Sequence, residues 1–250
     1  MDTPPSASVL GMITQRQFTL SDILSSAWEI YSKNFAAIAI ITVLIILPIN
    51  LISGAMTNGI ESGDINSISW SSFGILGVLI ALFGFINPLA ITHLVQKQVE
   101  GVTVTYQEAI KAAFGKWSNG VITSIILAFL LVILYVLLII PGIIFTIFWA
   151  FAISAVMIDN VSGMQALSAS KAAVKGRWWR VFGYFIVFGL ITGLLSSVVT
   201  AIFNFSDSWI VTAVGSTISS ILFAFSLVAS VLLYINLKSV KAPAPVTVQA

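Results

Sequence analysis

The side chains best suited to chemistry in this chain gather between residues 171 and 180. Four of the eleven basic residues fall there, and two of them flank a tryptophan pair. Basic and tryptophan side chains beside an apolar run are typical of the headgroup level of a membrane. Each cation near an anionic leaflet contributes about 1 kcal/mol of attraction. We therefore predict that this cluster contacts lipid headgroups, through Lys171, Lys175, Arg177, Trp178, Trp179 and Arg180. The alternative is that the cluster sets the topology of the chain without binding a lipid.

The sequence contains no recognisable catalytic or metal-binding constellation. His93 is the only histidine, and no cysteine is present. A zinc site needs several such ligands together, and cysteine would also be required for a thiolate nucleophile or a disulfide. Neither a G-x-S-x-G nucleophile motif nor a Gly-rich phosphate loop occurs. We predict a non-enzymatic protein with no catalytic residue, no cofactor and no metal, and we interpret His93 as a satisfied interfacial side chain.

Three acidic residues, Glu61, Asp64 and Asp207, lie on connections that carry no Lys or Arg. Glu61 and Asp64 share one connection, and Asp207 could approach them from another. We interpret these residues as solvated loop charges. The alternative is a weak cation site on the external face.

Two Pro and Asn pairs interrupt the apolar sequence, Pro48 with Asn50 and Asn87 with Pro88. Proline in a membrane helix frees a carbonyl, which a neighbouring polar group can satisfy. The favoured interpretation is a packing kink with a hydrogen-bonding asparagine. Broken helices also bind substrates in transporters, so the alternative is a polar cavity for a neutral substrate.

A stripe of small residues at intervals of four runs through the segment 181–203, at Gly189, Gly193 and Ser197. Such stripes let a second helix approach closely. Ser216, Ser220 and Ala224 repeat the spacing in the segment 209–233. We expect these two segments to pair within one chain, and homodimerisation through the first stripe is the alternative.

The composition requires a lipid environment. Of the 250 residues 58% are hydrophobic and 8% are charged, whereas soluble domains contain about 25% charged residues. Six apolar runs approach the roughly 20 residues that a membrane-spanning helix needs, and none contains Asp, Glu, Lys or Arg. These runs are 36–56, 73–95, 121–140, 143–158, 181–203 and 209–233. We predict an all-α polytopic membrane protein with six transmembrane helices, in which Pro141-Gly142 breaks the third run from the fourth.

The charged residues predict the orientation of these helices. All eleven basic residues fall before the first run, after the sixth run, or in the connections after the second and fourth runs. Six crossings place those segments on one face, and the positive-inside rule makes that face cytoplasmic. We therefore predict a bacterial inner-membrane protein with both termini in the cytoplasm. It would comprise a disordered leader (1–17), a single membrane domain (18–238) and a cytoplasmic tail (239–250).

Three basic segments that precede helix pairs resemble one another. Each begins near a helix-capping residue, alternates apolar and polar residues at helical spacing, and ends with a basic residue beside an aromatic one. Thr105 with Glu108 fits a capping box, and Thr19 with Asp22 is a weaker version. We predict amphipathic helices along the cytoplasmic interface, each followed by a transmembrane hairpin. Whether the three modules are true repeats is left open.

The stretch from Pro141 to Gly183 also carries a family resemblance. It contains a Pro-Gly pair that opens a helix, an acidic residue at its end (Asp159), an Ala-Leu-x-x-Ser segment that ends at Ser170, and a Lys-Gly-Arg-Trp-Trp junction. It resembles the membrane domain beside some bacterial glycerophosphoryl diester phosphodiesterases and related stand-alone six-helix proteins of unknown function. Asp159 stands where that family usually has Glu, and a proline common near Ala155 is missing. The family's active site belongs to a separate soluble barrel, which we do not expect in this chain, so the resemblance implies a membrane scaffold and no catalytic residue.

These observations favour a non-enzymatic integral membrane module, a scaffold or regulator in membrane or lipid homeostasis. Expected partners are membrane lipids, above all the anionic inner leaflet, and a partner protein or a second copy of the chain. A net charge of +2 gives no indication of nucleic-acid binding. The alternative function is a transporter, channel or lipid-moving protein for a neutral or lipidic substrate, and an enzyme is the weakest interpretation because charged groups are missing from the apolar runs.

Overall fold

The computed structural model describes residues 17–61, 77–78, 80, 83–203, 205 and 208–240, with the side chains of 57–61 left out. Every regular element in this part of the chain is an α-helix, which confirms the predicted fold class. The helices are α2 (Leu20–Lys33), α3 (Phe35–Glu61), α5 (Ile86–Val99), α6 (Tyr106–Gly115), α7 (Trp117–Leu137), α8 (Ile139–Phe148), α9 (Ala152–Ile158), α10 (Met164–Val174), α11 (Trp178–Phe203) and α12 (Trp209–Ser239). The predicted leader and tail lie almost entirely outside the described residues.

Five helical segments in the described part are long and apolar enough to cross a membrane. They are Phe35–Met56, Trp117–Leu137, Ile139–Ile158, Trp178–Phe203 and Trp209–Ser239. The protein is therefore an all-α polytopic membrane protein. The predicted run 73–95 falls partly outside the described residues, and its end belongs to α5, which continues to Val99.

Both short helices α2 and α6 begin with the expected capping box. In α2 the Thr19 amide donates to Asp22 Oδ2 at 2.8 Å, and the Asp22 amide donates back to Thr19 Oγ1 at 3.3 Å. In α6 the Thr105 amide donates to Glu108 Oε2 at 2.8 Å, and the Glu108 amide donates back to Thr105 Oγ1 at 3.3 Å. These bonds satisfy amides that have no partner inside the helix. Hydrogen bonds from the Thr105 amide and hydroxyl lower the pKa of Glu108, so their contribution to stability is lost as the pH falls through that pKa.

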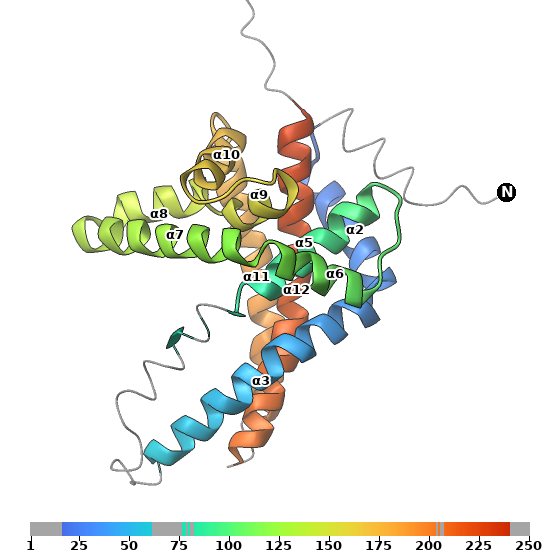
Figure 1. The fold of residues 1–250 in the computed structure, drawn as a ribbon, viewed down its shortest axis with the longest axis vertical. Coiled ribbons are helices and arrows are strands. Elements are labelled where there is room, and N and C mark those ends of the chain that lie inside the picture. Colours follow the sequence, from blue (N-terminus) through green and yellow to red (C-terminus); the bar gives the residue numbers. More distant parts are fainter. Residues whose placement is uncertain are drawn as a thin grey trace, which may run out of the picture.

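The core lies where the C-terminal half of α12 meets α2 and α5, with α9 packed against α5. Figure 1 shows α12 as the red and orange helix at the centre, with α3 and α11 running downward beside it. Phe151 stacks on Tyr234 with ring centroids 5.3 Å apart, and both side chains are fully buried. Hairpin α7–α8 projects to the left in Figure 1. Many of its apolar side chains, such as Val136, are exposed. Exposed apolar helices of this length require lipid as their solvent.

The break between the third and fourth predicted runs falls at Leu138, and the expected break at Pro141-Gly142 is wrong. Leu138 is extended, with φ −157° and ψ 125°, and α8 begins at the next residue. Pro141 then lies in the first turn of α8, where its missing N–H has no intrahelical partner to lose. A Cβ on Gly142 would lie 2.6 Å from the Tyr135 ring. The glycine therefore lets α7 and α8 pack closely.

The fourth predicted run is also not one continuous helix. Helix α8 ends at Phe148 and α9 begins at Ala152, with a turn over residues 149–151. A broken helix leaves backbone groups that water cannot satisfy at membrane depth. Other parts of the chain must therefore supply partners for them.

Helices α11 and α12 pair within the chain, as expected, but the predicted small-residue stripe is not the contact. Gly189, Gly193 and Ser197 are exposed, and a Cβ on either glycine would meet nothing within 4 Å. Helix α11 instead packs on α12 through its neighbouring face, where Ser226 Oγ donates to Phe188 O at 3.1 Å. Adjacent helical positions are about 100° apart, so a contact through this face turns the stripe outward. The hydrogen bond from Ser226 lies on the face of α11 that contacts α12, and the spacing of the small residues did not predict that face.

We expect two glycine substitutions to separate buried from open helix faces. A Cβ on Gly120 of α7 would lie 2.6 Å from the buried Phe85 ring. Gly120→Val should therefore lower the free energy of unfolding by about 1–3 kcal/mol, measured by denaturation of the purified protein in mixed detergent micelles. Gly193→Val is the matched control and should leave the unfolding free energy within about 0.5 kcal/mol. Equal losses in both variants would show that α11 packs through its stripe after all.

Candidate functional site

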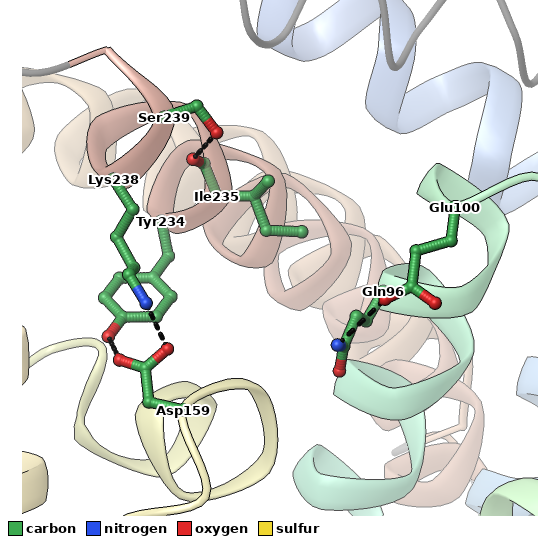
Figure 2. A network of polar contacts seen from close by, with 7 residues as sticks. All are labelled: Gln96, Glu100, Asp159, Tyr234, Ile235, Lys238 and Ser239. Carbon is green, nitrogen blue, oxygen red and sulfur yellow. Dashed lines mark hydrogen bonds and ion pairs between the residues drawn. The ribbon is translucent and has the colours of Figure 1, made fainter.

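The carboxylate of Asp159 links the end of α9 to the end of α12. Tyr234 Oη donates to Asp159 Oδ2 at 2.6 Å, and Lys238 Nζ forms an ion pair with Oδ1 (Figure 2). Tyr234 and Lys238 are four residues apart on α12, so they share one face of the helix. The Asp159 side chain is 11% exposed, so these partners replace most of its contact with water. We call Asp159, Tyr234 and Lys238 the Asp159 clamp.

Arg177 caps the C-terminal end of α12 from the turn before α11. Its guanidinium donates to Leu237 O at 2.9 Å and to Val240 O at 3.2 Å. The last carbonyls of a helix lack partners within it, and a cation there also interacts favourably with the helix dipole. Burial, and then the neighbouring charge of Arg180, lower the pKa of Arg177. Arg177 therefore satisfies backbone carbonyls at the end of α12.

Arg180 holds the segment that leads into α2. Its guanidinium donates to Phe18 O and to Gln17 Oε1, and its Nε donates to Tyr184 Oη at 3.0 Å. The Phe18 amide in turn donates to Asn236 Oδ1 of α12 at 3.0 Å. Residues 17 and 18 are therefore fixed between α11 and α12.

Ser170 of α10 closes the break between α8 and α9. Its Oγ donates to Phe148 O at 2.8 Å and accepts from the Phe151 amide at 3.1 Å. The Ser170 side chain is fully buried. One hydroxyl therefore satisfies an acceptor and a donor that the broken helix exposes. This role was not predicted, although Ser170 ended the Ala-Leu-x-x-Ser segment.

The loop between α9 and α10 is fixed to α7. Asn160, with φ +57°, accepts a hydrogen bond from Lys116 Nζ through its side-chain oxygen. Gly163, with φ +56°, donates its amide to Thr123 Oγ1 at 2.8 Å. A side chain other than glycine would be strained at Gly163. We call the region from Asp159 to Arg180, with the ends of α7 and α12 and residues 17–18, the polar junction.

The predicted headgroup cluster divides into two groups. Arg177 and Arg180 bind protein groups, and Trp178 donates its indole N–H to Ile144 O at 3.1 Å. Lys171, Lys175 and Trp179 remain exposed. Two hollows adjoin this region. The first measures about 590 Å³ and is lined by alanine side chains and by the charged side chains of Asp159, Lys175, Arg177 and Lys238 among others. The second is an apolar groove between α8 and α11.

The other predicted site residues lie apart from the polar junction. Asn50 donates to Thr217 Oγ1 of α12 at 3.0 Å, and Asn87 accepts from Thr42 of α3 at 3.4 Å. Thr42 and Asn50 are eight residues apart on α3, about 12 Å along its axis, so the two asparagines occupy different levels. Pro48 is exposed inside α3, and Pro88 lies in the first turn of α5.

Metal-type ligands do not gather in the described part of the chain, where no group of three or more His, Asp or Glu side chains occurs. His93 is half-buried in α5. Glu61 is the last residue of α3, and Asp64 and Asp207 lie outside the described residues.

Comparisons of the chain with protein-family models, with curated proteins and with solved structures give no match.

The arrangement of the polar junction is suited to holding helix ends together. It joins residues 17–18, the α9–α10 loop and the end of α12 through Lys116, Arg177, Arg180 and Lys238, one or more from three of the basic segments of the sequence. Tyr234 and Asn236 were missed in the sequence, since both lie at the end of an apolar run. Their spacing with Lys238, on adjoining turns of one helix, was the available signal.

We expect Ser170→Ala to destabilise the protein. The substitution leaves Phe148 O and the Phe151 amide without their partner, at a cost of about 1–3 kcal/mol. Ser168→Ala is the matched control, because Ser168 is exposed on the same helix. Denaturation in mixed micelles should show the loss for Ser170→Ala alone. A stable Ser170→Ala variant would mean that the break needs no side-chain partner.

Proposed function

We propose that this protein is a non-enzymatic integral membrane module that anchors or regulates a partner in membrane or lipid homeostasis. The observation that carries the proposal is the use of charge at the polar junction. Asp159 and Arg177 bind the end of α12, and Arg180 binds residues 17–18. Asp159 and Arg177 also line the hollow of about 590 Å³, but their polar groups are bonded to other parts of the chain, whereas a catalytic site would leave such groups for a substrate.

We also infer that the polar junction faces the cytoplasm of a bacterial cell. The contacts that join the basic segments support a common face for them, and basic segments are retained on the cytoplasmic side. Tryptophan and tyrosine at this level, such as Trp178, Trp179 and Tyr184, are typical of the headgroup boundary. Exposed Lys171 and Lys175 would then face an anionic leaflet.

The family resemblance of residues 141–183 supports the same proposal. Two residues that carry it, Asp159 and Ser170, have structural partners in α12 and at the α8–α9 break. A membrane domain that retains such residues for folding fits a scaffold. The asparagines of α3 and α5 pair with threonines on neighbouring helices, which favours packing over a transport cavity.

Photo-crosslinking in native membranes tests the proposal. A photoreactive residue at Gln165, exposed on α10, should form a discrete protein adduct, because α10 belongs to the face that would meet a partner. The same residue at Leu190, which is 60% exposed on the apolar surface of α11, is the control and should label lipid.

Purified protein in liposomes supplies the contrary outcome. The proposal predicts no hydrolysis of phospholipid or glycerophosphodiester above that of empty liposomes. Hydrolysis that Asp159→Asn abolishes would overturn it, since the carboxylate would then act in chemistry.

A further inference from the structure

An apolar groove opens between α8 and the first turn of α11. Its volume is about 470 Å³, and it is lined by Ile140, Ile143, Ile144, Phe148, Trp178 and Trp179. The Trp178 indole N–H is already used in a hydrogen bond to Ile144 O, and its ring stacks on Phe182 with centroids 5.0 Å apart. The groove therefore has a fixed wall that offers hydrocarbon contact. Its volume is in the range of small-molecule sites, about 300–1,000 Å³.

The side chain of Lys171 lies beside this groove. Lys171 Nζ lies 5.9 Å from the ring centroid of Phe148, which lines the groove, and 5.5 Å from that of Phe145. Lys175 follows four residues later, directly after the end of α10, and lines the hollow that Asp159, Arg177 and Lys238 share. Both lysines are exposed. Hydrocarbon contact next to exposed Lys171, with a second exposed cation four residues along the chain, matches an amphiphile with an apolar chain and an anionic head.

We propose that the groove holds one acyl chain of an anionic phospholipid and that Lys171 and Lys175 bind its phosphate. This inference rests on the proposed function, because it names the ligand of the basic face. A transmembrane helix of a partner would fill the groove but would leave the two cations without a counter-charge. The position of exposed Trp179 at the groove agrees with the headgroup boundary, where indole rings accumulate.

The same geometry selects among headgroups. The zwitterionic lipid phosphatidylcholine also carries a quaternary ammonium, whose positive charge the two lysines repel unless a free anionic group lies at the site. The carboxylate beside Lys175 is Asp159, which is already paired with Lys238 and bonded to Tyr234. The site therefore favours phosphatidylglycerol over phosphatidylcholine.

Native mass spectrometry of the full chain tests the site. The protein is equilibrated with an equal mixture of the two lipids in detergent, and the retained ratio is read from the spectra. Lys171→Gln should lower the phosphatidylglycerol preference about fivefold, and the double variant with Lys175→Gln about 25-fold. Lys111→Gln, an exposed lysine on α6, is the charge control and should retain the preference.

A second pair of variants tests the groove. Ile143→Trp should fill it and remove most of the retained lipid, whereas Ile125→Trp on the exposed surface of α7 should not. Unfolding midpoints of all variants establish that they fold. The assignment would be overturned by an unchanged lipid load in Ile143→Trp or by an equal loss of preference in Lys111→Gln. It would also be overturned if Ile143→Trp kept its lipid but lost the photo-crosslinked protein adduct. Lysolipid or free headgroup in the same spectra would instead overturn the proposed non-enzymatic function and leave the lipid site standing.

Discussion

The burial of the Asp159 carboxylate is the constraint on which the rest of the polar junction depends. A charge with 11% of its side chain exposed needs a counter-charge and hydrogen bonds. Lys238 and Tyr234 supply both from one face of α12. The carboxylate thereby fixes the end of α9 against the last turns of α12. Because Tyr234 also stacks on Phe151, the polar contact and the aromatic core hold the same two segments together.

Two further features of the junction follow from the cost of unsatisfied backbone groups near a membrane. The break between α8 and α9 exposes an acceptor and a donor, and Ser170 binds both. The end of α12 exposes carbonyls, and Arg177 binds two of them. Lipid cannot make these bonds. Arg177, which the sequence groups with the predicted headgroup cluster, therefore satisfies backbone groups, and exposed Lys171 and Lys175 are left for a ligand.

Much of the fold could be predicted from local signals. The first apolar run, predicted as 36–56, matches the span Phe35–Met56, because a charge-free apolar run has few alternatives to a membrane helix. The caps at Thr19 and Thr105 were predicted because a capping box is complete within four residues. Contacts between distant segments have no comparable signal in the local sequence. The stripe at Gly193 has the spacing of a packing face, yet α11 meets α12 through Thr192 and Phe188.

The sequence indicated the segment that forms the polar junction, but it did not indicate which groups the side chains of that segment bind. The cluster from Lys171 to Arg180 was interpreted as one headgroup surface, whereas its arginines bind backbone carbonyls. Arginine at a helix end and arginine at a headgroup have the same local sequence, and the choice between them depends on where α12 ends.

A double-mutant cycle between Asp159 and Tyr234 tests the central claim most directly. Asp159→Asn, Tyr234→Phe and the double variant are unfolded in mixed micelles, and the coupling energy is taken from the three differences. A clamp that holds α9 to α12 predicts a favourable coupling of about 1–2 kcal/mol, since hydrogen bonds to charged groups contribute about 1.5–3 kcal/mol and the partner lysine is partly exposed. Additive losses, with a coupling below about 0.5 kcal/mol, would contradict a structural role for the carboxylate.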